Sequence, residues 1–504
     1  MSKEKKLRKY AERRIADYVG EDDSLARLKQ EQRAAGQEET LRRKAIFKKA
    51  AVTLASVVAV FILTFCLIWF PSSGIAKETG EGEIGRITED AATLINDALT
   101  GAGGKPKSYY IAHRTDYSYA DAVGEIEAPS GASDLEQPRA GQITAKAMND
   151  NDDYAAWRSY FAAATDNDPA GKFERYTTGD WAFDTAQRVK VTVRDGEDPV
   201  FGAEVVYYDA AQVRRVARTG IDGVAYLFPG QETGAVTVKS GESERQGSYS
   251  LEARDLLFDL TESEAQVNVI RIMFVIDATG SMGDEMLYLT TELHDVVRRV
   301  TEQAEGVRID LALLFYRDDG DTEKFYYSEF MTVTEGTGLQ TQLNVLSKET
   351  ATGGGDYPEA MDEALALAAG KDWGDENSTN LLFLVLDAPP HSDSEKSLRT
   401  ASAVRTASEK GIRICPVLCS GADVFCEYVT RMCALLTGGT SVFVTDDSGI
   451  GGSHLDPELP DVTVEKLNDL LVRLIVGYHT GDFGTPASWN AGGEETDPVP
   501  DGQD

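Results

Sequence analysis

The residues best suited to chemistry follow the most apolar run of the chain. Residues 267–276 read VNVIRIMFVI, and Asp277, Thr279 and Ser281 come next at a spacing of two. A continuous apolar and β-branched run predicts a strand buried on both faces, as in a parallel sheet. One carboxylate and two hydroxyls suit a hard divalent cation. The alternative is that the hydroxyls only cap the helix predicted over residues 284–305.

Two further clusters of oxygen side chains follow predicted elements. The stretch TATGGGDYPE supplies Thr352, Asp356 and Glu359 just before a predicted helix, and Asp387 directly follows the apolar run LLFLVL. Ligand sites of open α/β sheets gather at the carboxyl edge of the strands, so three loops there are expected to present a carboxylate each. A rigid scaffold that holds ligands from several loops suits a cation site, whereas carboxylates without a cation repel one another.

The elements that must position these residues alternate between strand and helix from residue 266 to about 480. This alternation predicts an α/β fold with a doubly wound, mostly parallel sheet and right-handed crossovers. Besides 267–276, the predicted strands are 308–315, 381–386, 411–418 and 441–445. The predicted helices after residue 305 are 358–369, 395–410, 424–436 and 464–476.

Region 266–480 resembles the von Willebrand factor type A domain with its metal-ion-dependent adhesion site. The family's first motif, Asp-x-Ser/Thr-x-Ser, is matched by Asp277, Thr279 and Ser281, and its last motif, an Asp at the end of a central strand, by Asp387. The resemblance implies a site for Mg²⁺ or Mn²⁺, with Ca²⁺ as the alternative. It also implies an open coordination position that an acidic group of a partner completes.

The middle motif of the family usually offers a Thr, which Thr352 matches. The stretch from Asp356 to Glu359, DYPE, looks more like the β-integrin version, Asp-x-Pro-Glu. In that version the Glu reaches the central metal, and the Asp and nearby groups hold a second cation. Asp284 and Glu285 similarly match an integrin stretch, Ser-Met-x-Asp-Asp, that builds an adjacent cation site. Alternatively, both acids only stabilise the N-terminus of the helix.

An uncharged apolar run covers residues 50–70 and ends at Pro71. It is long enough to cross a bilayer as a helix. Lys and Arg precede it, so the positive-inside rule places residues 1–49 in the cytoplasm and the later domains outside the cell. A cleaved signal peptide is the alternative, but the run is long and far from the N-terminus for one. The sequence therefore predicts a single-pass protein of the cell membrane.

The region between the predicted span and the α/β domain divides in two. Residues 71–180 are rich in Gly, Ser, Asp and Pro, which predicts an extracellular stalk and a structured lead-in. Residues 181–262 show alternating strands and turn sequences. Their stretches VTVRDGEDPVFGAEV and TGIDGVAYL resemble small β-sandwich modules of the carboxypeptidase-regulatory or transthyretin-like type, which implies a spacer. The acidic tail, residues 481–504, is predicted to be disordered.

Four cysteines fall within one predicted strand–loop–helix stretch: Cys415, Cys419, Cys426 and Cys433. Disulfides are permitted outside the cell. If a bridge forms, it is expected to join Cys419 to Cys426 or Cys433. Four buried free thiols are the alternative.

The charge and the motifs of the chain argue against two classes of function. A net charge of −34 argues against nucleic-acid binding, which needs Lys and Arg for the phosphates. No GxSxG or HExxH motif occurs, so no enzymatic activity is predicted. The segment from about 138 to 478 also resembles bacterial surface proteins that combine a lead-in, a β-sandwich and an A domain. We therefore expect a membrane-anchored binding or adhesion protein whose ligand is an acidic group of a protein or surface. A structural subunit of an envelope complex and a metal-dependent hydrolase are the alternatives.

Overall fold

The computed structural model describes residues 138–162, 171–261, 267–303, 306–374, 377–455 and 462–489. All of them belong to one compact unit, Ala128–Asp504. The predicted cytoplasmic tail, the predicted membrane span and most of the predicted stalk lie outside these residues, as does the end of the acidic tail. Within the described part of the chain, no helix is long and apolar enough to cross a membrane.

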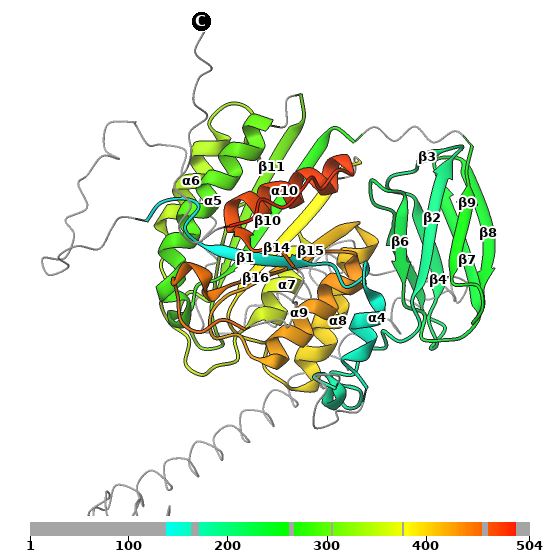
Figure 1. The fold of residues 1–504 in the computed structure, drawn as a ribbon, viewed down its shortest axis with the longest axis horizontal. Coiled ribbons are helices and arrows are strands. Elements are labelled where there is room, and N and C mark those ends of the chain that lie inside the picture. The colour runs from blue at the N-terminus through cyan, green and yellow to red at the C-terminus, as the bar shows by residue number, and fades with distance from the viewer. Residues whose placement is uncertain are drawn as a thin grey trace, which may run out of the picture. The chain divides into compact units, whose positions relative to one another are not determined.

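A mixed sheet of nine strands forms the centre of the α/β part, in the order β12-β11-β10-β14-β15-β16-β1-β17 with β13 on β11 (Figure 1). The five central strands run parallel. They are β10 (Val269–Asp277), β11 (Arg308–Tyr316), β14 (Thr379–Leu386), β15 (Ile412–Leu418) and β16 (Ser441–Val444). The remaining strands are β1 (Thr144–Met148), β12 (Phe325–Tyr327), β13 (Met331–Thr332) and β17 (Glu465–Lys466). Every residue of β10 and β14 is buried, as expected for strands covered on both faces.

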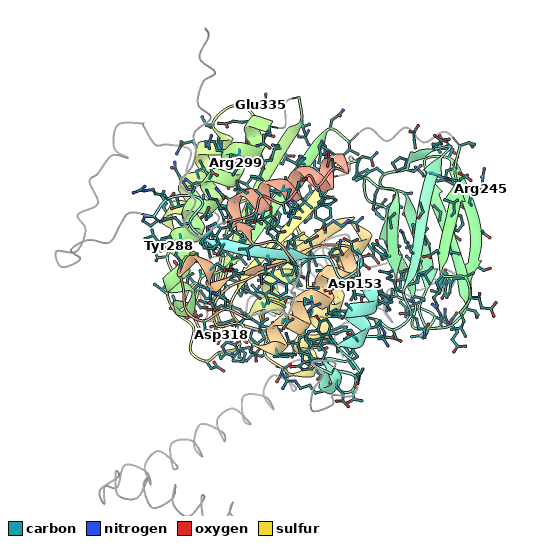
Figure 2. The ribbon with its side chains drawn as sticks, in the orientation of Figure 1. Asp153, Arg245, Tyr288, Arg299, Asp318 and Glu335 are labelled. Atoms are coloured by element: carbon teal, nitrogen blue, oxygen red, sulfur yellow. The ribbon has the colours of Figure 1, made fainter. Side chains whose placement is uncertain are left out.

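Helices cover both faces of this sheet, and each layer shares a separate apolar core with it. One layer consists of α5 (Gly283–Gln303), α6 (Gly338–Lys348) and α10 (Leu467–Thr480). The other consists of α4 (Tyr154–Ser159), α7 (Met361–Gly370), α8 (Ser394–Glu409) and α9 (Val424–Thr437). Within the first layer, Arg299 of α5 (Figure 2) forms an ion pair of 2.7 Å with Asp469 of α10. The predicted doubly wound α/β fold is confirmed.

The sheet also uses chain that precedes the β-rich region. β1 pairs antiparallel with β16 and β17, so residues 189–259 are inserted between two strands of the same sheet. Glu292 of α5 fixes the entry to β1, because its carboxylate accepts hydrogen bonds from the amides of Gly141, Gln142 and Ile143 at 2.7, 2.8 and 3.0 Å. The sequence did not predict this strand, since TAKAM is short and lacks a strand pattern.

The inserted region consists of two four-stranded sheets around a core of small and branched apolar residues. One sheet contains β2 (Val189–Asp195), β3 (Asp198–Pro199), β6 (Val224–Leu227) and β9 (Asp255–Asp259). The other contains β4 (Glu204–Tyr208), β5 (Arg214–Arg218), β7 (Gly234–Ser240) and β8 (Ser243–Tyr249). Alternating burial along β2 shows why period-two hydrophobicity indicated strands here.

A buried ion-pair network ties the lead-in to α9. The guanidinium of Arg431 is fully buried and reaches both oxygens of Asp150, with Nη2–Oδ1 at 2.6 Å and Nε–Oδ2 at 3.0 Å. Its Nη1 donates to Glu427 at 2.8 Å, and Lys172 pairs with the other oxygen of Glu427 at 2.6 Å. The rings of Trp157, Tyr160 and Phe173 surround the guanidinium at 4.7–5.6 Å. The lead-in is therefore an integral part of the α/β core.

The four cysteines of the α/β part are buried, and no disulfide joins them in the described part of the chain: Cys415, Cys419, Cys426 and Cys433. The structure thus has the arrangement with four buried thiols and does not contain the bridge considered for Cys419.

Candidate functional site

The candidate site lies where the strand order of the sheet reverses. β10 has β11 on one side and β14 on the other, so the chain crosses over in opposite directions from this point. Ligands of open α/β sheets bind in the crevice at the carboxyl ends of such strands. Asp277 is the last residue of β10, and Asp387 directly follows β14. Since Ile276 is in register with Val385, the two carboxylates emerge side by side.

Hydrogen bonds link the three residues of the first motif. Oδ1 of Asp277 accepts from the amide of Thr279 at 2.9 Å and from its hydroxyl at 2.7 Å. The hydroxyls of Thr279 and Ser281 are 3.1 Å apart. Thr279 precedes the short helix Gly280–Met282 without a capping bond from its side chain, so its hydroxyl serves Asp277 instead. Asp277 and Thr279 are fully buried, whereas Ser281 is exposed.

A backbone contact brings Glu359 into the same group. Its amide donates to the carbonyl of Pro389 at 2.9 Å, and an isolated parallel bridge joins Glu359 to Pro390. These contacts hold the DYPE loop against the loop that follows β14. Glu359 and Asp387 are each only 3% exposed. Three buried carboxylates from three loops therefore gather at one edge of the sheet, as the sequence predicted.

Burial and mutual repulsion make these carboxyl groups weak acids. Burial, followed by the charge of Asp387, raises the pKa of Asp277 to about 7, although hydrogen bonds from Thr279 oppose the shift. Burial, followed by the charges of Asp277, Asp318, Asp387 and Asp321, raises the pKa of Glu359 to about 9. The carboxyl groups of Asp277 and Glu359 therefore keep protons near neutral pH. These protons reduce the negative charge of the cluster, which is otherwise not compensated.

The donor set fits a hard divalent cation. Oδ2 of Asp277 and Oε2 of Glu359 are buried and have no hydrogen-bond partner among the described residues. A buried polar atom without a partner is costly, and a buried charge without compensation is more so. A cation that takes oxygen ligands would satisfy both the empty lone pairs and the negative charge. Asp387, Thr279 and Ser281 would complete such a ligand set.

The other predicted ligands lie differently. The amide of Thr352 donates to the carbonyl of Ala278 at 2.9 Å, but its side chain is exposed and makes no hydrogen bond to the described site residues. Asp356 is exposed and belongs to a neighbouring group with Asp318 and His391. Asp284 and Glu285 fall in the first turn of α5, and their side chains lie outside the described residues.

Two residues that the sequence patterns did not indicate hold the loop between α6 and α7, here called the middle loop, in place. The guanidinium of Arg317 donates to the carbonyls of Thr352 at 2.9 Å and Thr350 at 3.1 Å. Oδ2 of Asp321 accepts from the amides of Gly354 at 2.9 Å and Asp318 at 3.1 Å. The sequence RDDGD directly after the apolar run of β11 was the available signal, because that strand ends at the same edge as β10.

Gly354 allows the middle loop to approach the carboxylates closely. Its φ is +74°, and a Cβ there would lie 2.8 Å from Oε1 of Glu359 and 3.2 Å from Cβ of Thr279. A larger residue would therefore push the loop away from the site and would strain the backbone.

Without a divalent cation, the free energy of unfolding is expected to fall as the pH rises from about 5 to about 9. In this window the folded chain keeps protons on Asp277 and Glu359, whose pKa values are about 7 and about 9, while the unfolded carboxyls have already lost theirs. Thermal unfolding midpoints in chelator at several pH values measure this slope. The Asp277→Asn variant should show a shallower slope, and a flat or rising wild-type profile would contradict the expectation.

Comparison with known proteins agrees with this fold. Residues 271–426 match the model of the von Willebrand factor A domain family. The matched region runs from β10 to the first turn of α9 and contains Asp277, Glu359 and Asp387. The resemblance to this family is thus confirmed for that part of the chain. No curated protein matches the chain.

Several solved structures are similar at low identity. The pilus adhesin SpaC from Lactobacillus rhamnosus GG, in its open conformation, has 10% identity and a TM-score of 0.30 over 57% of this chain and 34% of the adhesin. An aerotolerance-related membrane protein from Bacteroides fragilis NCTC 9343 has 13% identity and a TM-score of 0.22, over 42% of this chain and 88% of that protein. A von Willebrand factor type A protein from Catenulispora acidiphila has 14% identity and a TM-score of 0.24, over 49% and 52%. The chain thus spans about a third of the adhesin's length.

Proposed function

We propose that the carboxyl edge of β10 and β14 binds Mg²⁺ or Mn²⁺, with Ca²⁺ as the alternative, and that the protein uses this site to hold an acidic group of a partner protein or surface ligand. The ligands of the cation are Asp277, Thr279, Ser281, Glu359 and Asp387. The observation that carries the proposal is the cluster of buried carboxyl groups, in which oxygens of Asp277 and Glu359 have no partner among the described residues.

The residues of the site contribute to such binding in different ways. Asp277 and Asp387 are fixed by the ends of buried strands, which keeps their oxygens in place before any ligand arrives. The hydroxyls of Thr279 and Ser281 contribute oxygens without adding negative charge. Ser281 is exposed, so the site opens to solvent on its side. The bound cation supplies the positive charge that an acidic partner needs from a chain of net charge −34.

The predicted membrane span determines on which side of the membrane the site lies. We propose that residues 50–70 anchor the protein in the cell membrane with residues 1–49 in the cytoplasm, so that the A-domain region faces the outside. A binding function without catalysis fits this arrangement, because the site residues can hold an acidic group without any step that breaks a bond.

A peptide array tests the proposed function. The full chain is applied, in Mg²⁺ or in EDTA, to peptides that contain Asp or Glu and to copies with Asn or Gln at those positions. We expect binding only in Mg²⁺ and only to the acidic peptides, and we expect the Asp277→Asn variant not to bind. Asp372→Asn is the matched control, because this exposed Asp lies between α7 and β14, at the opposite edge of the sheet. Equal binding in EDTA, or equal binding of the amide copies, would refute the proposal.

A further inference from the structure

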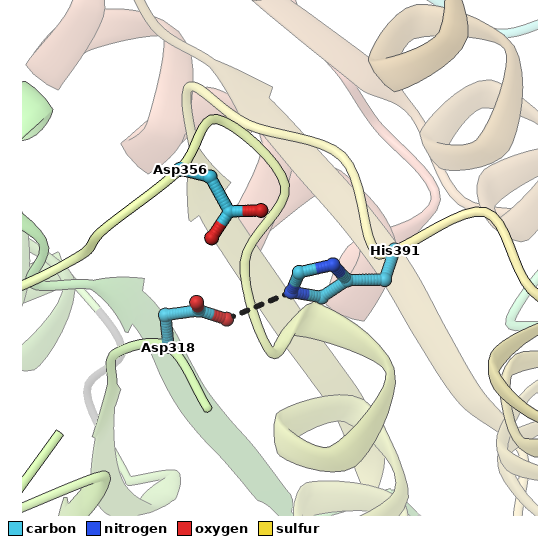
Figure 3. Close-up of side chains that lie close together, drawn as sticks. All are labelled: Asp318, Asp356 and His391. Atoms are coloured by element: carbon cyan, nitrogen blue, oxygen red, sulfur yellow. Dashed lines mark hydrogen bonds and ion pairs between the residues drawn. The ribbon is translucent and has the colours of Figure 1, made fainter. Parts of the chain in front are cut away.

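A second group of metal-ligating side chains lies beside the buried carboxylates. Asp318, Asp356 and His391 each offer one ligand atom, and these atoms all lie within 4.8 Å of one another. Figure 3 shows the three side chains turned toward a common gap. We propose that they form a separate cation site that prefers Zn²⁺ to Mg²⁺ and Ca²⁺.

The geometry of the three side chains suits one small ion. Bonds from Zn²⁺ to imidazole nitrogen or carboxylate oxygen are about 2.0–2.2 Å long, so ligand atoms around one ion lie within roughly 4 Å of each other. Oδ1 of Asp318 and Nε2 of His391 are already 2.9 Å apart. Asp318 is 4% exposed, while Asp356 is exposed and offers a ligand atom within 4.8 Å of the other two. Water would take the positions that the protein leaves open.

The backbone contacts that hold the loops around the buried carboxylates also hold the three proposed zinc ligands in place. The amide of Asp318 donates to Asp321, which also accepts from Gly354 of the middle loop. The bridge between Glu359 and Pro390 sets His391 next to the DYPE loop that carries Asp356. Three loops of different origin are thus held together before any ion binds, which keeps the entropic cost of binding low.

The charges of the neighbouring side chains also favour a bound cation. The adjacent Asp319 is neutralised by Lys324 and by Lys396, the latter at 3.0 Å, so these lysines do not serve Asp318. Glu359, a ligand of the proposed central site, also lies close enough to Asp318 to feel its charge. A second positive charge here would relieve the repulsion within the whole cluster.

The imidazole decides which metal binds. Mg²⁺ and Ca²⁺ take oxygen ligands, whereas imidazole suits Zn²⁺ and other transition metals. Among these metals Zn²⁺ binds nitrogen and oxygen sites more tightly than Mn²⁺. The site therefore differs from an oxygen-only second cation site, because His391 contributes a nitrogen ligand.

A zinc competition assay on the full chain tests this inference. Zn²⁺ is titrated against a chromophoric chelator in excess Mg²⁺, which occupies the central site. We expect His391→Gln to weaken Zn²⁺ binding by at least about 100-fold, since a lost ligand should cost no less than a lost outer-shell partner. The visible spectrum of bound Co²⁺ gives a second readout, because its ligand-field bands depend on the imidazole nitrogen.

Two further variants make the outcome decisive. His454→Gln is the matched control, because His454 pairs with Asp446 at 2.7 Å but belongs to no such three-residue group among the described residues. We expect it to leave Zn²⁺ affinity unchanged. Asp277→Asn should also retain Zn²⁺ binding, which separates this site from the central one. Equal Zn²⁺ affinity in wild type and His391→Gln, or displacement of Zn²⁺ by equimolar Mg²⁺, would overturn the inference.

Discussion

Replacement of Arg431 by Met is expected to lower the free energy of unfolding by about 3–5 kcal/mol, the cost of breaking a buried ion pair from one side. Asp150 would lose its guanidinium partner while remaining 2% exposed, and Glu427 would keep only Lys172. The free energy of unfolding is measured by urea titration of the full chain, with a spectroscopic signal that reports on the α/β part.

Two comparison variants separate this effect from a general loss of charge. Arg298 of α5 also pairs with two acids, Asp295 at 2.7 Å and Glu302 at 2.9 Å, but its side chain is 53% exposed. Arg298→Met should therefore cost less than about 1 kcal/mol. In the triple variant with Asp150→Asn and Glu427→Gln, much of the lost stability should return, since neither acid then leaves a buried negative charge unpaired and only Lys172 loses its partner. Equal costs for the two single variants would show that burial of the network is unimportant.

Replacement of Asp277 by Asn is expected to reduce Mg²⁺ affinity by at least about 100-fold, because the buried carboxylate at the end of β10 is the best-fixed ligand of the group. The same substitution should stabilise the metal-free chain at pH 8. It removes one of three buried acids that repel each other, and the neighbouring Glu359 is then easier to ionise.

Calorimetric titration and thermal unfolding in chelator measure these two effects separately. Asp372→Asn, at the opposite edge of the sheet, should change neither quantity. Wild-type Mg²⁺ affinity in the Asp277→Asn chain would exclude Asp277 as a ligand. Lower metal-free stability at pH 8 would instead show that the carboxylate is needed for the fold.

The sequence predicted the central part of the site because local signals coincide there. The apolar run of β10 ends abruptly at Asp277, and the run of β14 ends in the same way before Asp387. Parallel strands bring such ends together without further information. Glu359 could be added from its place before a helix, although the loop that carries it follows α6 and not a strand.

The rest depends on contacts that local patterns do not encode. β1 pairs with a strand that lies far along the chain, since Ala145 is in register with Val444 of β16. Neither Ala145 nor its neighbours show a strand pattern. The exposed side chain of Thr352 is a different case. The residue type fits a ligand, but the backbone bond to Ala278 sets its position, and that bond is independent of the side chain. His391 contacts Asp318 at 2.9 Å across two loops that lie far apart in the sequence, next to the bridge between Glu359 and Pro390.

Proton release on Mg²⁺ binding would show that the buried carboxyl groups of Asp277 and Glu359 ligate the cation. The full chain is titrated with Mg²⁺ at pH 7 by calorimetry in two buffers that differ in ionisation enthalpy. Since Asp277 and Glu359 have pKa values of about 7 and about 9, ligation must displace their protons. We expect saturable binding with release of about one to two protons per chain. No binding to the folded chain, or binding without proton release, would contradict it.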